Sequence, residues 1–132
     1  MEAKVVVHMK DRRIHKGVTQ DFDPASEHFY LLPAEGGGVP VRIRVDDMKA
    51  LFYVKDYFGN AAFVARRDFE EAREKERRLV VRFSDGEEIW GTTVGGELDT
   101  GTGFYLYPAD PRDNNLQVFV VRSSLSGVRE VS

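Results

Sequence analysis

The sequence predicts a mainly β protein made of two small five-stranded barrels in tandem, joined by a short charged helix. Three observations support this prediction. Short apolar segments occur twice in the same order, a Phe-Tyr-Leu-x-Pro-Ala block is present in both copies, and a segment dense in charge separates them. The predicted units are residues 1–55 and 78–132, with residues 56–77 as the linker.

Each unit begins with an apolar strand that starts at a basic residue and ends at an aspartate. Side chains alternate between the two faces of a strand. One face is apolar in both copies and is predicted to face the core: Val5, Val7 and Met9 in the first, Leu79, Val81 and Phe83 in the second. The opposite face carries Val6 and His8, which match Val80 and Arg82. Since that face accepts a charge, we expect it to be partly exposed and His8 to lie at the surface.

Turn signals and glycines divide the rest of each unit. Asp11-Arg12 and Asp85-Gly86 predict hairpin turns, since Asp-Gly is a strong hairpin signal. Gly17 and Gly91 lie within the second strands, where glycine usually marks a bend or a bulge. The later strands are predicted at residues 29–32, 39–45 and 50–55, and again at 104–107, 116–122 and 127–131. Short, bent strands in meander order favour a small barrel, because closure removes exposed edges.

The linker differs in kind from both units. Residues 66–78 are dense in charge, and Glu71 and Lys75 form a pair at the helical i,i+4 spacing. Asp68 is suited to cap the start of a helix. The favoured interpretation is a solvated helical connector; a partner-binding helix and a disordered segment are the alternatives.

Composition bounds the function. The chain has 132 residues, no cysteine and a formal net charge of −3. Disulfides, thiolate metal sites and thiol nucleophiles are therefore excluded. The N-terminus has no apolar signal region and no run is long enough to span a membrane, so we expect a cytoplasmic protein without membrane contact. The near balance of charge argues mildly against nucleic-acid binding.

No constellation of catalytic or metal-ligating residues stands out. The three histidines, His8, His15 and His28, have no counterparts in the second copy, which favours surface histidines over a metal site. The glycines and serines lack the motifs of a phosphate-binding loop or a nucleophile elbow. We therefore expect no enzymatic activity, no cofactor and no metal.

The second copy resembles the Sm-like barrel of Sm, LSm and Hfq proteins. The resemblance rests on Asp85-Gly86, Gly91-Thr92 and Asp99 followed by Phe104-Tyr105-Leu106, and on the segment from Val120 to Leu125, which is similar to the second Sm motif. It covers residues 78–131 and, more faintly, residues 4–54. It implies a bent barrel whose RNA contacts lie near Arg122 and, in the first copy, near His28.

Departures from the Sm pattern weaken the RNA implication. RNA-binding members carry an asparagine after the aspartate, where this chain has Gly103 in the second copy and His28 in the first. Ser123 replaces the glycine that follows the arginine. Asp46 and Asp47 stand near the same junction in the first copy and would repel phosphate.

The chain also resembles an uncharacterised bacterial domain that is sometimes joined to PilZ or response-regulator modules. PilZ domains bind cyclic dinucleotides through an Arg-x-x-x-Arg motif, and Arg73 and Arg77 have that spacing. Two arginines of this kind suit phosphates and guanine edges. The second PilZ motif fails, because Gly101 stands where its serine belongs.

These patterns favour a non-enzymatic binding or adaptor module in bacterial regulation, with a protein as the partner. RNA or single-stranded nucleic-acid binding is the first alternative, for which Trp90 beside alternating aromatics would supply stacking. Cyclic-di-GMP sensing of the PilZ type is the second. A homo-oligomer through edge strands is a further expectation. The candidate contact residues are Arg73, Arg77, Trp90, Arg122 and His28.

Overall fold

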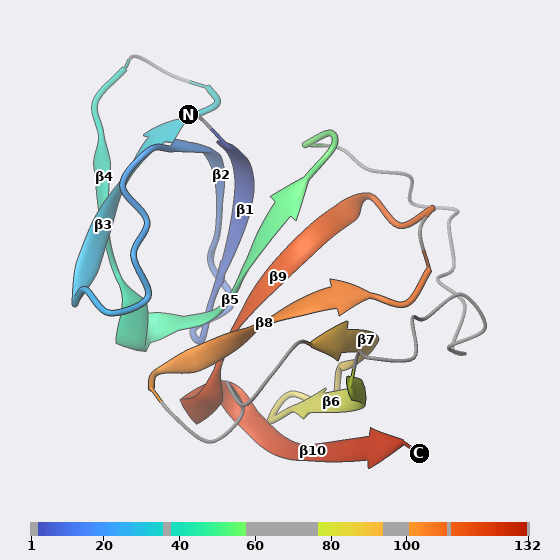
Figure 1. Ribbon diagram of the computed structural model, residues 1–132. Helices are drawn as coiled ribbons and strands as arrows, with labels where there is room; N and C mark the ends of the chain where they lie inside the picture. The colour runs from blue at the N-terminus through green and yellow to red at the C-terminus, as the bar shows by residue number, and fades with distance from the viewer. Residues whose placement is uncertain (1–2, 36–37, 58–76, 94–100, 111, 132) are drawn as a thin grey trace.

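The ten predicted strands form one antiparallel sheet. The computed structural model describes residues 3–35, 38–57, 77–93, 101–110 and 112–131 (Figure 1). The strands are β1 (Ala3–Met9), β2 (Ile14–Thr19), β3 (His28–Pro33), β4 (Val41–Arg44), β5 (Met48–Val54), β6 (Arg77–Phe83), β7 (Glu88–Thr93), β8 (Gly103–Pro108), β9 (Asn115–Val121) and β10 (Leu125–Val131). Short 3-10 turns, η1 (Val45–Asp47) and η3 (Arg122–Ser124), join β4 to β5 and β9 to β10.

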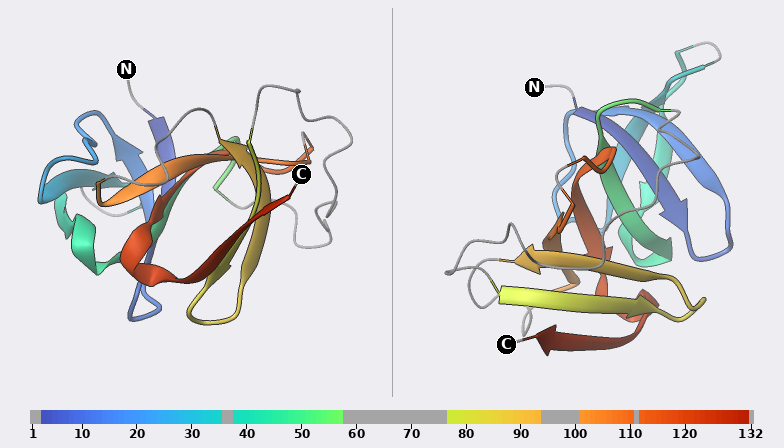
Figure 2. Two further views of the ribbon diagram at one scale, coloured as in Figure 1. Left: turned by 60° about the horizontal axis from the view of Figure 1, so that its bottom comes forward. Right: turned by 90° about the vertical axis from the view of Figure 1, so that its right-hand side faces the viewer.

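The strand order is β10-β6-β7-β8-β9-β5-β1-β2-β3-β4. Within each half the fifth strand pairs with the first, and the second and third strands follow it across the sheet. The pairing of β5 with β9 then joins the halves. The sheet twists strongly along its length, so that β6, β7 and β10 lie across the direction of β1 and β2 (Figure 2).

The prediction of two barrels joined by a helix is wrong in its main point. The halves share one continuous sheet and are not separate barrels. Residues 66–76 of the predicted helix lie outside the described residues, and Arg77 and Arg78 at its end belong to strand β6. The mainly β class and the positions of all ten strands are confirmed.

The two halves use the same hairpin turn. The amide of Met9 donates to the carbonyl of Arg13 at 2.9 Å, and Phe83 and Glu87 make the same bond at 2.8 Å. An aspartate stabilises each turn from within: Asp11 Oδ1 accepts the Arg13 amide, and Asp85 Oδ1 accepts the Glu87 amide. These contacts confirm the two predicted hairpins.

One residue of each turn lies in the left-handed region of backbone space. Gly86 has φ +95°, and Arg12 occupies the corresponding position at φ +75°. A three-residue loop that ends in a left-handed residue is a common hairpin geometry. Glycine adopts it freely, whereas a residue with a Cβ is strained there. The first half therefore holds an arginine where the second has the easier residue.

Gly17 and Gly91 permit close approach between neighbouring strands. A Cβ on Gly17 would lie 2.2 Å from the carbonyl oxygen of Leu32, and one on Gly91 would lie 2.5 Å from that of Tyr107. Each glycine is opposite the proline that ends the third strand of its half. A side chain at either position would therefore displace the neighbouring strand, which accounts for glycine within both second strands.

Two cores fill the molecule, and the central strands contribute to both. Phe119 and Val121 of β9 belong to the first core, although their strand lies in the second half. Ala50 and Phe52 of β5 belong to the second core, although their strand lies in the first half. The first core holds Val5, Val7, Met9, Phe29, Leu31, Ile43, Val45, Met48, Leu51, Phe119 and Val121. The second holds Val6, Ala50, Phe52, Val54, Leu79, Val81, Phe83, Phe104, Leu106, Val118 and Val120.

This exchange explains why the two-barrel prediction failed. The face of the first strand that carries Val6 was expected to be partly exposed, but Val6 is 8% exposed and packs in the second core. Its counterpart Val80 is 3% exposed. Strands that are apolar on both faces must be covered on both, which requires the halves to pack against each other.

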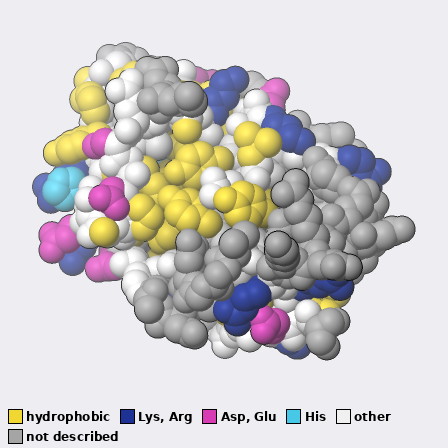
Figure 3. Space-filling model, in the orientation of Figure 1, with side chains coloured by type: hydrophobic (Ala, Val, Ile, Leu, Met, Phe, Trp, Pro, Cys, Tyr) yellow, Lys and Arg dark blue, Asp and Glu magenta, His cyan; other side chains and the backbone are white. Residues whose placement is uncertain are grey.

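Aromatic side chains cover the rim of the first core. The ring of Phe22 lies 5.0 Å from that of Phe29 and 5.3 Å from that of Phe119, and Tyr105 lies 5.2 Å from Phe119. Phe22 and Tyr105 remain only partly buried. Figure 3 shows hydrophobic side chains gathered at the centre of this face of the molecule, where the two halves meet.

Candidate functional site

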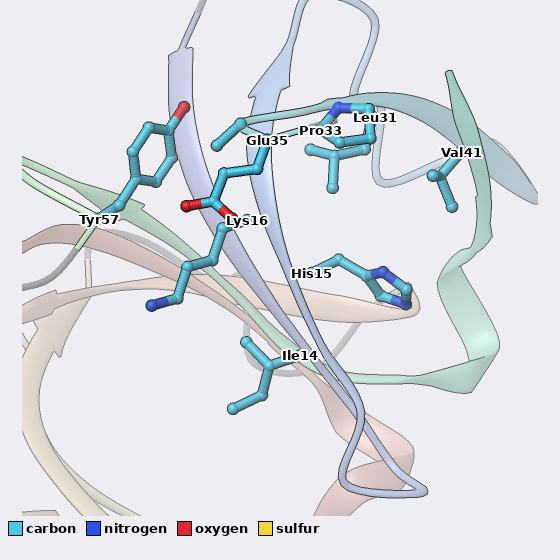
Figure 4. Close-up of a pocket in the computed structure, with 9 residues that line it drawn as sticks. Ile14, His15, Lys16, Leu31, Pro33, Glu35, Val41 and Tyr57 are labelled. Carbon is cyan, nitrogen blue, oxygen red and sulfur yellow. The ribbon is translucent and has the colours of Figure 1, made fainter. Parts of the chain in front are cut away.

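The larger described hollow lies at the open side of the first half. Its volume is about 530 Å³, within the range of sites that take a small molecule or a peptide side chain. Strand β2 forms one wall, and the end of β3 and the start of β4 form the other. The lining residues are Ile14, His15, Lys16, Leu31, Pro33, Ala34, Glu35, Val41 and Tyr57 (Figure 4).

The walls of this hollow are mainly apolar, and polar groups stand at its margin. Leu31, Val41 and the ring of His15 lie on one side (Figure 4). The side chains of Lys16, Glu35 and Tyr57 gather on the other. An apolar group of a ligand can enter this hollow while the polar groups next to it on the ligand contact the polar side chains at the margin.

The corresponding place in the second half is occupied by larger apolar groups. His15 pairs with Val7 as Ile89 pairs with Val81, and Ile89 packs against the second core. In the same way Lys16 corresponds to the half-buried Trp90. The side chains that line the hollow therefore differ in kind from those at the corresponding positions of the second half.

A second hollow of about 410 Å³ lies between the halves. The β1–β2 hairpin forms one side of it, and the β6–β7 turn and η3 form the other. Four of its lining residues are cationic, namely Lys10, Arg12, Arg13 and Lys49. The full lining is His8, Met9, Lys10, Arg12, Arg13, Ile14, Lys49, Phe83, Ser84, Asp85, Ser123 and Ser124. We refer to it as the junction groove.

Lys49 forms ion pairs across the junction groove. Its ammonium group lies 2.7 Å from both Asp85 and Glu87 and 4.6 Å from the centre of the Phe83 ring. Burial by itself would lower the pKa of Lys49, but the two carboxylates outweigh this effect and raise the pKa. Lys49 belongs to the first half and its partners to the second, so this ion pair crosses the junction.

Lys10 also crosses the groove. Its ammonium group donates to the carbonyl of Asp46 and to Ser123 Oγ, both at 2.6 Å. Neither acceptor is a carboxylate, so the charge of Lys10 is hydrogen-bonded but not neutralised by these contacts. Arg12 next to it is exposed and lowers the pKa of Asp85 only as a minor contributor, after Lys49. The side of the groove that the β1–β2 hairpin forms is therefore positive.

His8 is partly exposed and lines the junction groove. Its ring is 4.8 Å from that of Phe52, at a tilt of 60°. Burial lowers the pKa of His8, although the nearby Glu87 carboxylate acts in the opposite direction. His8 is thus partly exposed, as expected for its face, but it lines the groove because that face of β1 also packs against the second half.

Ile14 separates the two hollows and lines both of them. Its side chain is 53% exposed at the start of β2. An exposed isoleucine between an apolar hollow and a positive groove gives one continuous surface with two kinds of contact. This Ile14 surface, made of Ile14 and the two hollows, is the candidate site.

The residues nominated from the sequence lie elsewhere. Arg73 is outside the described residues. Arg77 lies in β6, where its guanidinium contacts Glu130 of β10 at 2.6 Å. That ion pair links β6 to β10, its neighbour in the sheet, and engages the guanidinium group of Arg77.

The other three nominated residues are spread over the molecule. Trp90 is half-buried in β7. Arg122 starts η3, with its guanidinium 5.7 Å from the centre of the Phe104 ring. His28 starts β3, where Arg42 Nη2 lies 3.5 Å from its Nδ1. His28 belongs to the first half and the other two to the second.

Sequence reasoning missed Ile14 and Lys10. A signal was present, because Ile14 matches Glu88 and Lys10 matches Ser84 between the copies. Such differences between matched positions indicate where one half has acquired a contact of its own.

One protein family matches the chain over its whole length. The family of unknown function DUF6982 matches residues 1–132. The chain belongs to the DUF6982 family. No curated protein and no solved structure matches it. The function of this DUF6982 chain must therefore be inferred from its own residues.

Two further findings bear on the kind of site. Among the residues that the structure describes, no group of three or more His, Cys, Asp or Glu side chains is placed to hold a metal ion. No helix in the described part of the chain is long and apolar enough to cross a membrane.

Proposed function

We propose that this DUF6982 chain is a non-enzymatic adaptor that binds a protein partner through the Ile14 surface. The observation that carries the proposal is the exposed Ile14 between an apolar hollow and a positive groove. Concave and mainly apolar hollows with a few polar groups at the margin are typical of binding sites, and an exposed isoleucine between two hollows adds apolar contact area to them. Ile14 is the residue around which partner contacts would centre.

The chemistry of the surface indicates the partner's chemistry. The β1–β2 hairpin and the start of β2 carry Lys10, Arg12, Arg13 and Lys16, and Asp11 is the single acid among them. The matching partner is a protein segment that places an apolar side chain in the larger hollow and carboxylates against the hairpin. Charge complementarity of this kind increases the association rate and the selectivity.

A matched pair of variants tests the proposal. Ile14→Ala removes apolar surface from the site, and Leu116→Ala removes apolar surface from β9, away from both hollows. Ile14 is 53% exposed and Leu116 is 54% exposed, so the two changes remove comparable surface. A phage-displayed peptide library is selected on the wild-type protein, and the selected peptides are then titrated against both variants.

We expect the selected peptides to combine apolar and acidic residues. Their affinity should fall at least about tenfold with Ile14→Ala and stay unchanged with Leu116→Ala. Peptides that bind both variants equally, or a library that yields no binder, would reject the Ile14 surface as the site.

The Sm-like relationship stays a proposal. The same order of strands in each half, with a short turn between the fourth and fifth, supports it. RNA binding is not the favoured function, since His28 and Trp90 line neither hollow and only Arg122, next to Ser123 in η3, lies beside the positive hairpin. Retention of single-stranded oligonucleotides on a filter at low salt, with steep salt dependence, would reverse this preference.

Cyclic-di-GMP sensing is likewise not favoured. Arg77 is engaged by Glu130 and serves the sheet. Titration calorimetry of the wild-type protein with cyclic-di-GMP is expected to show no heat of binding.

A further inference from the structure

The described sheet has two outer strands, β4 and β10. Every other strand is paired on both sides. An unpaired outer strand is a template for another chain, and proteins commonly protect such strands. The internal junction between β5 and β9 shows what a paired edge of this fold requires.

The internal junction is apolar on both strands. On β9, Phe119 and Val121 are buried in the first core. On β5, Ala50 and Phe52 are buried in the second core. The register places Leu51 opposite Phe119 and Ala50 opposite Val120.

Strand β4 occupies the position in the first half that β9 occupies in the second. Tyr30 pairs with Arg42 as Tyr105 pairs with Phe119, so Arg42 corresponds to Phe119. By the same registers Arg44 corresponds to Val121. Both arginines are exposed, and neither forms an ion pair within the described part of the chain.

A proline is a further difference between β4 and β9. Pro40 precedes β4 at the position that corresponds to Gln117, which pairs with Tyr53 at the internal junction. Proline has no amide hydrogen and is confined to the edges of sheets. Strand β4 is also short, from Val41 to Arg44.

Strand β10 shows the same replacement on the other side. Val80 pairs with Arg129 as Val6 pairs with Phe52, so Arg129 corresponds to Phe52. Gly127 corresponds in the same way to Ala50. The two positions that fill the second core from β5 are thus a glycine and an exposed arginine on β10.

We propose that β4 and β10 are protected edges and that this chain does not join to a second copy in the way that its halves join to each other. Pairing β10 of one copy with β4 of the next would place Arg42 opposite Val128, and the carboxylate diagonal to it on that face, Glu130, is already paired with Arg77. Burying an unpaired charge is strongly unfavourable. The expectation of a homo-oligomer through edge strands is replaced by this proposal, which is independent of the Ile14 surface.

Two complementary variants test the proposal by rebuilding the junction. The first carries P40Q/R42F/R44V, which gives β4 the residues of β9. The second carries G127A/R129F, which gives β10 the residues of β5. A charge-matched control for the first variant carries P40Q/R42S/R44S. Circular dichroism checks that each is folded, and sedimentation velocity measures its state alone and in mixtures.

The wild-type protein and the charge-matched control should sediment as monomers. An equimolar mixture of the two rebuilt variants should form a complex, and the control should not bind the β10 variant. Wild-type oligomers that dissociate with Arg42→Asp would overturn the proposal. A mixture of folded rebuilt variants that stays monomeric would overturn it equally, because protection would then not depend on these residues.

Discussion

Gly17 and Gly91 show how single residues set the curvature of the sheet. A methyl group at either position would meet a backbone carbonyl of the neighbouring strand. Gly17→Ala and Gly91→Ala should each lower the free energy of unfolding by about 1–3 kcal/mol, since overpacked sites relax only by moving the backbone. Gly127→Ala is the control, because nothing lies within 4 Å of its added Cβ. Urea unfolding that shows equal effects at all three positions would contradict this account.

Arg12 keeps a strained conformation at the tip of the first hairpin. Arg12→Gly should raise the free energy of unfolding by about 0.5–1 kcal/mol, because the left-handed conformation is easier for glycine. Gly86→Ala at the matching turn should lower the free energy of unfolding. If Arg12 also contacts the partner, the stabilised R12G protein should bind the selected peptides more weakly. Thermal unfolding and peptide titration of the same preparations measure both effects.

His8 gives the protein a pH dependence of predictable sign. Burial lowers its pKa below the usual 6.5, so the folded state disfavours the charged ring. As the pH falls, the unfolded chain takes up this proton first, and the contribution of His8 to stability is therefore full above about pH 6.5 and declines below it. The free energy of unfolding should fall less steeply for His8→Gln than for the wild-type protein between about pH 7 and pH 5. Equal slopes for the two proteins would show that His8 is not buried at the junction.

At the scale of the strands, Lys49 contributes a defined contact between the halves. Its side chain is 13% exposed, whereas Asp85 and Glu87 remain about half-exposed at 44% and 49%. Lys49→Met should lower the free energy of unfolding by about 1 kcal/mol, because the solvated carboxylates lose little when the cation is removed. A double-mutant cycle with Asp85→Asn measures the coupling, which should decrease at high salt. A coupling that salt leaves unchanged would argue against this ion pair.

The positions of the strands could be predicted from the sequence, but the burial of the strand face that carries Val6 could not. Alternation identified Val5, Val7 and Met9 as core residues, and all three are buried. The same rule assigned Val6 to a partly exposed face, because its neighbour His8 is polar and matches an arginine. A polar side chain at one position does not expose a whole face when the other half of the same sheet packs over the rest of it. Only the pairing of β5 with β9 reveals that packing, and this pairing is long-range.

For the molecule as a whole, the candidate site depends on asymmetry between similar halves. His15 and Lys16 line a hollow in the first half, and Ile89 and Trp90 stand at the corresponding positions of the second. The sequence contained these differences, but it did not show that Ile14 stands between two hollows. That position follows from the junction, which brings the β6–β7 turn next to the first hairpin. Arg77 was nominated for its spacing to Arg73, and spacing alone could not show its ion pair with Glu130.

The shared cores imply that the two halves unfold together. Phe119 lies in β9 but packs among residues of the first half. Phe119→Ala should lower the free energy of unfolding by about 3–5 kcal/mol, and it should do so for both halves in one transition. Trp90 fluorescence, which reports the second half, and circular dichroism, which reports the strands of both halves, should give coincident urea curves. Separate midpoints would indicate that the halves are independent.

Native-state hydrogen exchange tests the central claim, one sheet with two interlocked cores, most directly. Amides of β1 and β5 in the first half are compared with those of β6 and β9 in the second. We predict that the most protected amides of both halves exchange with the same free energy, equal to that of global unfolding, because neither core is complete without the other half. Strands of one half that exchange at a distinctly lower free energy, while the other half stays protected, would contradict the account.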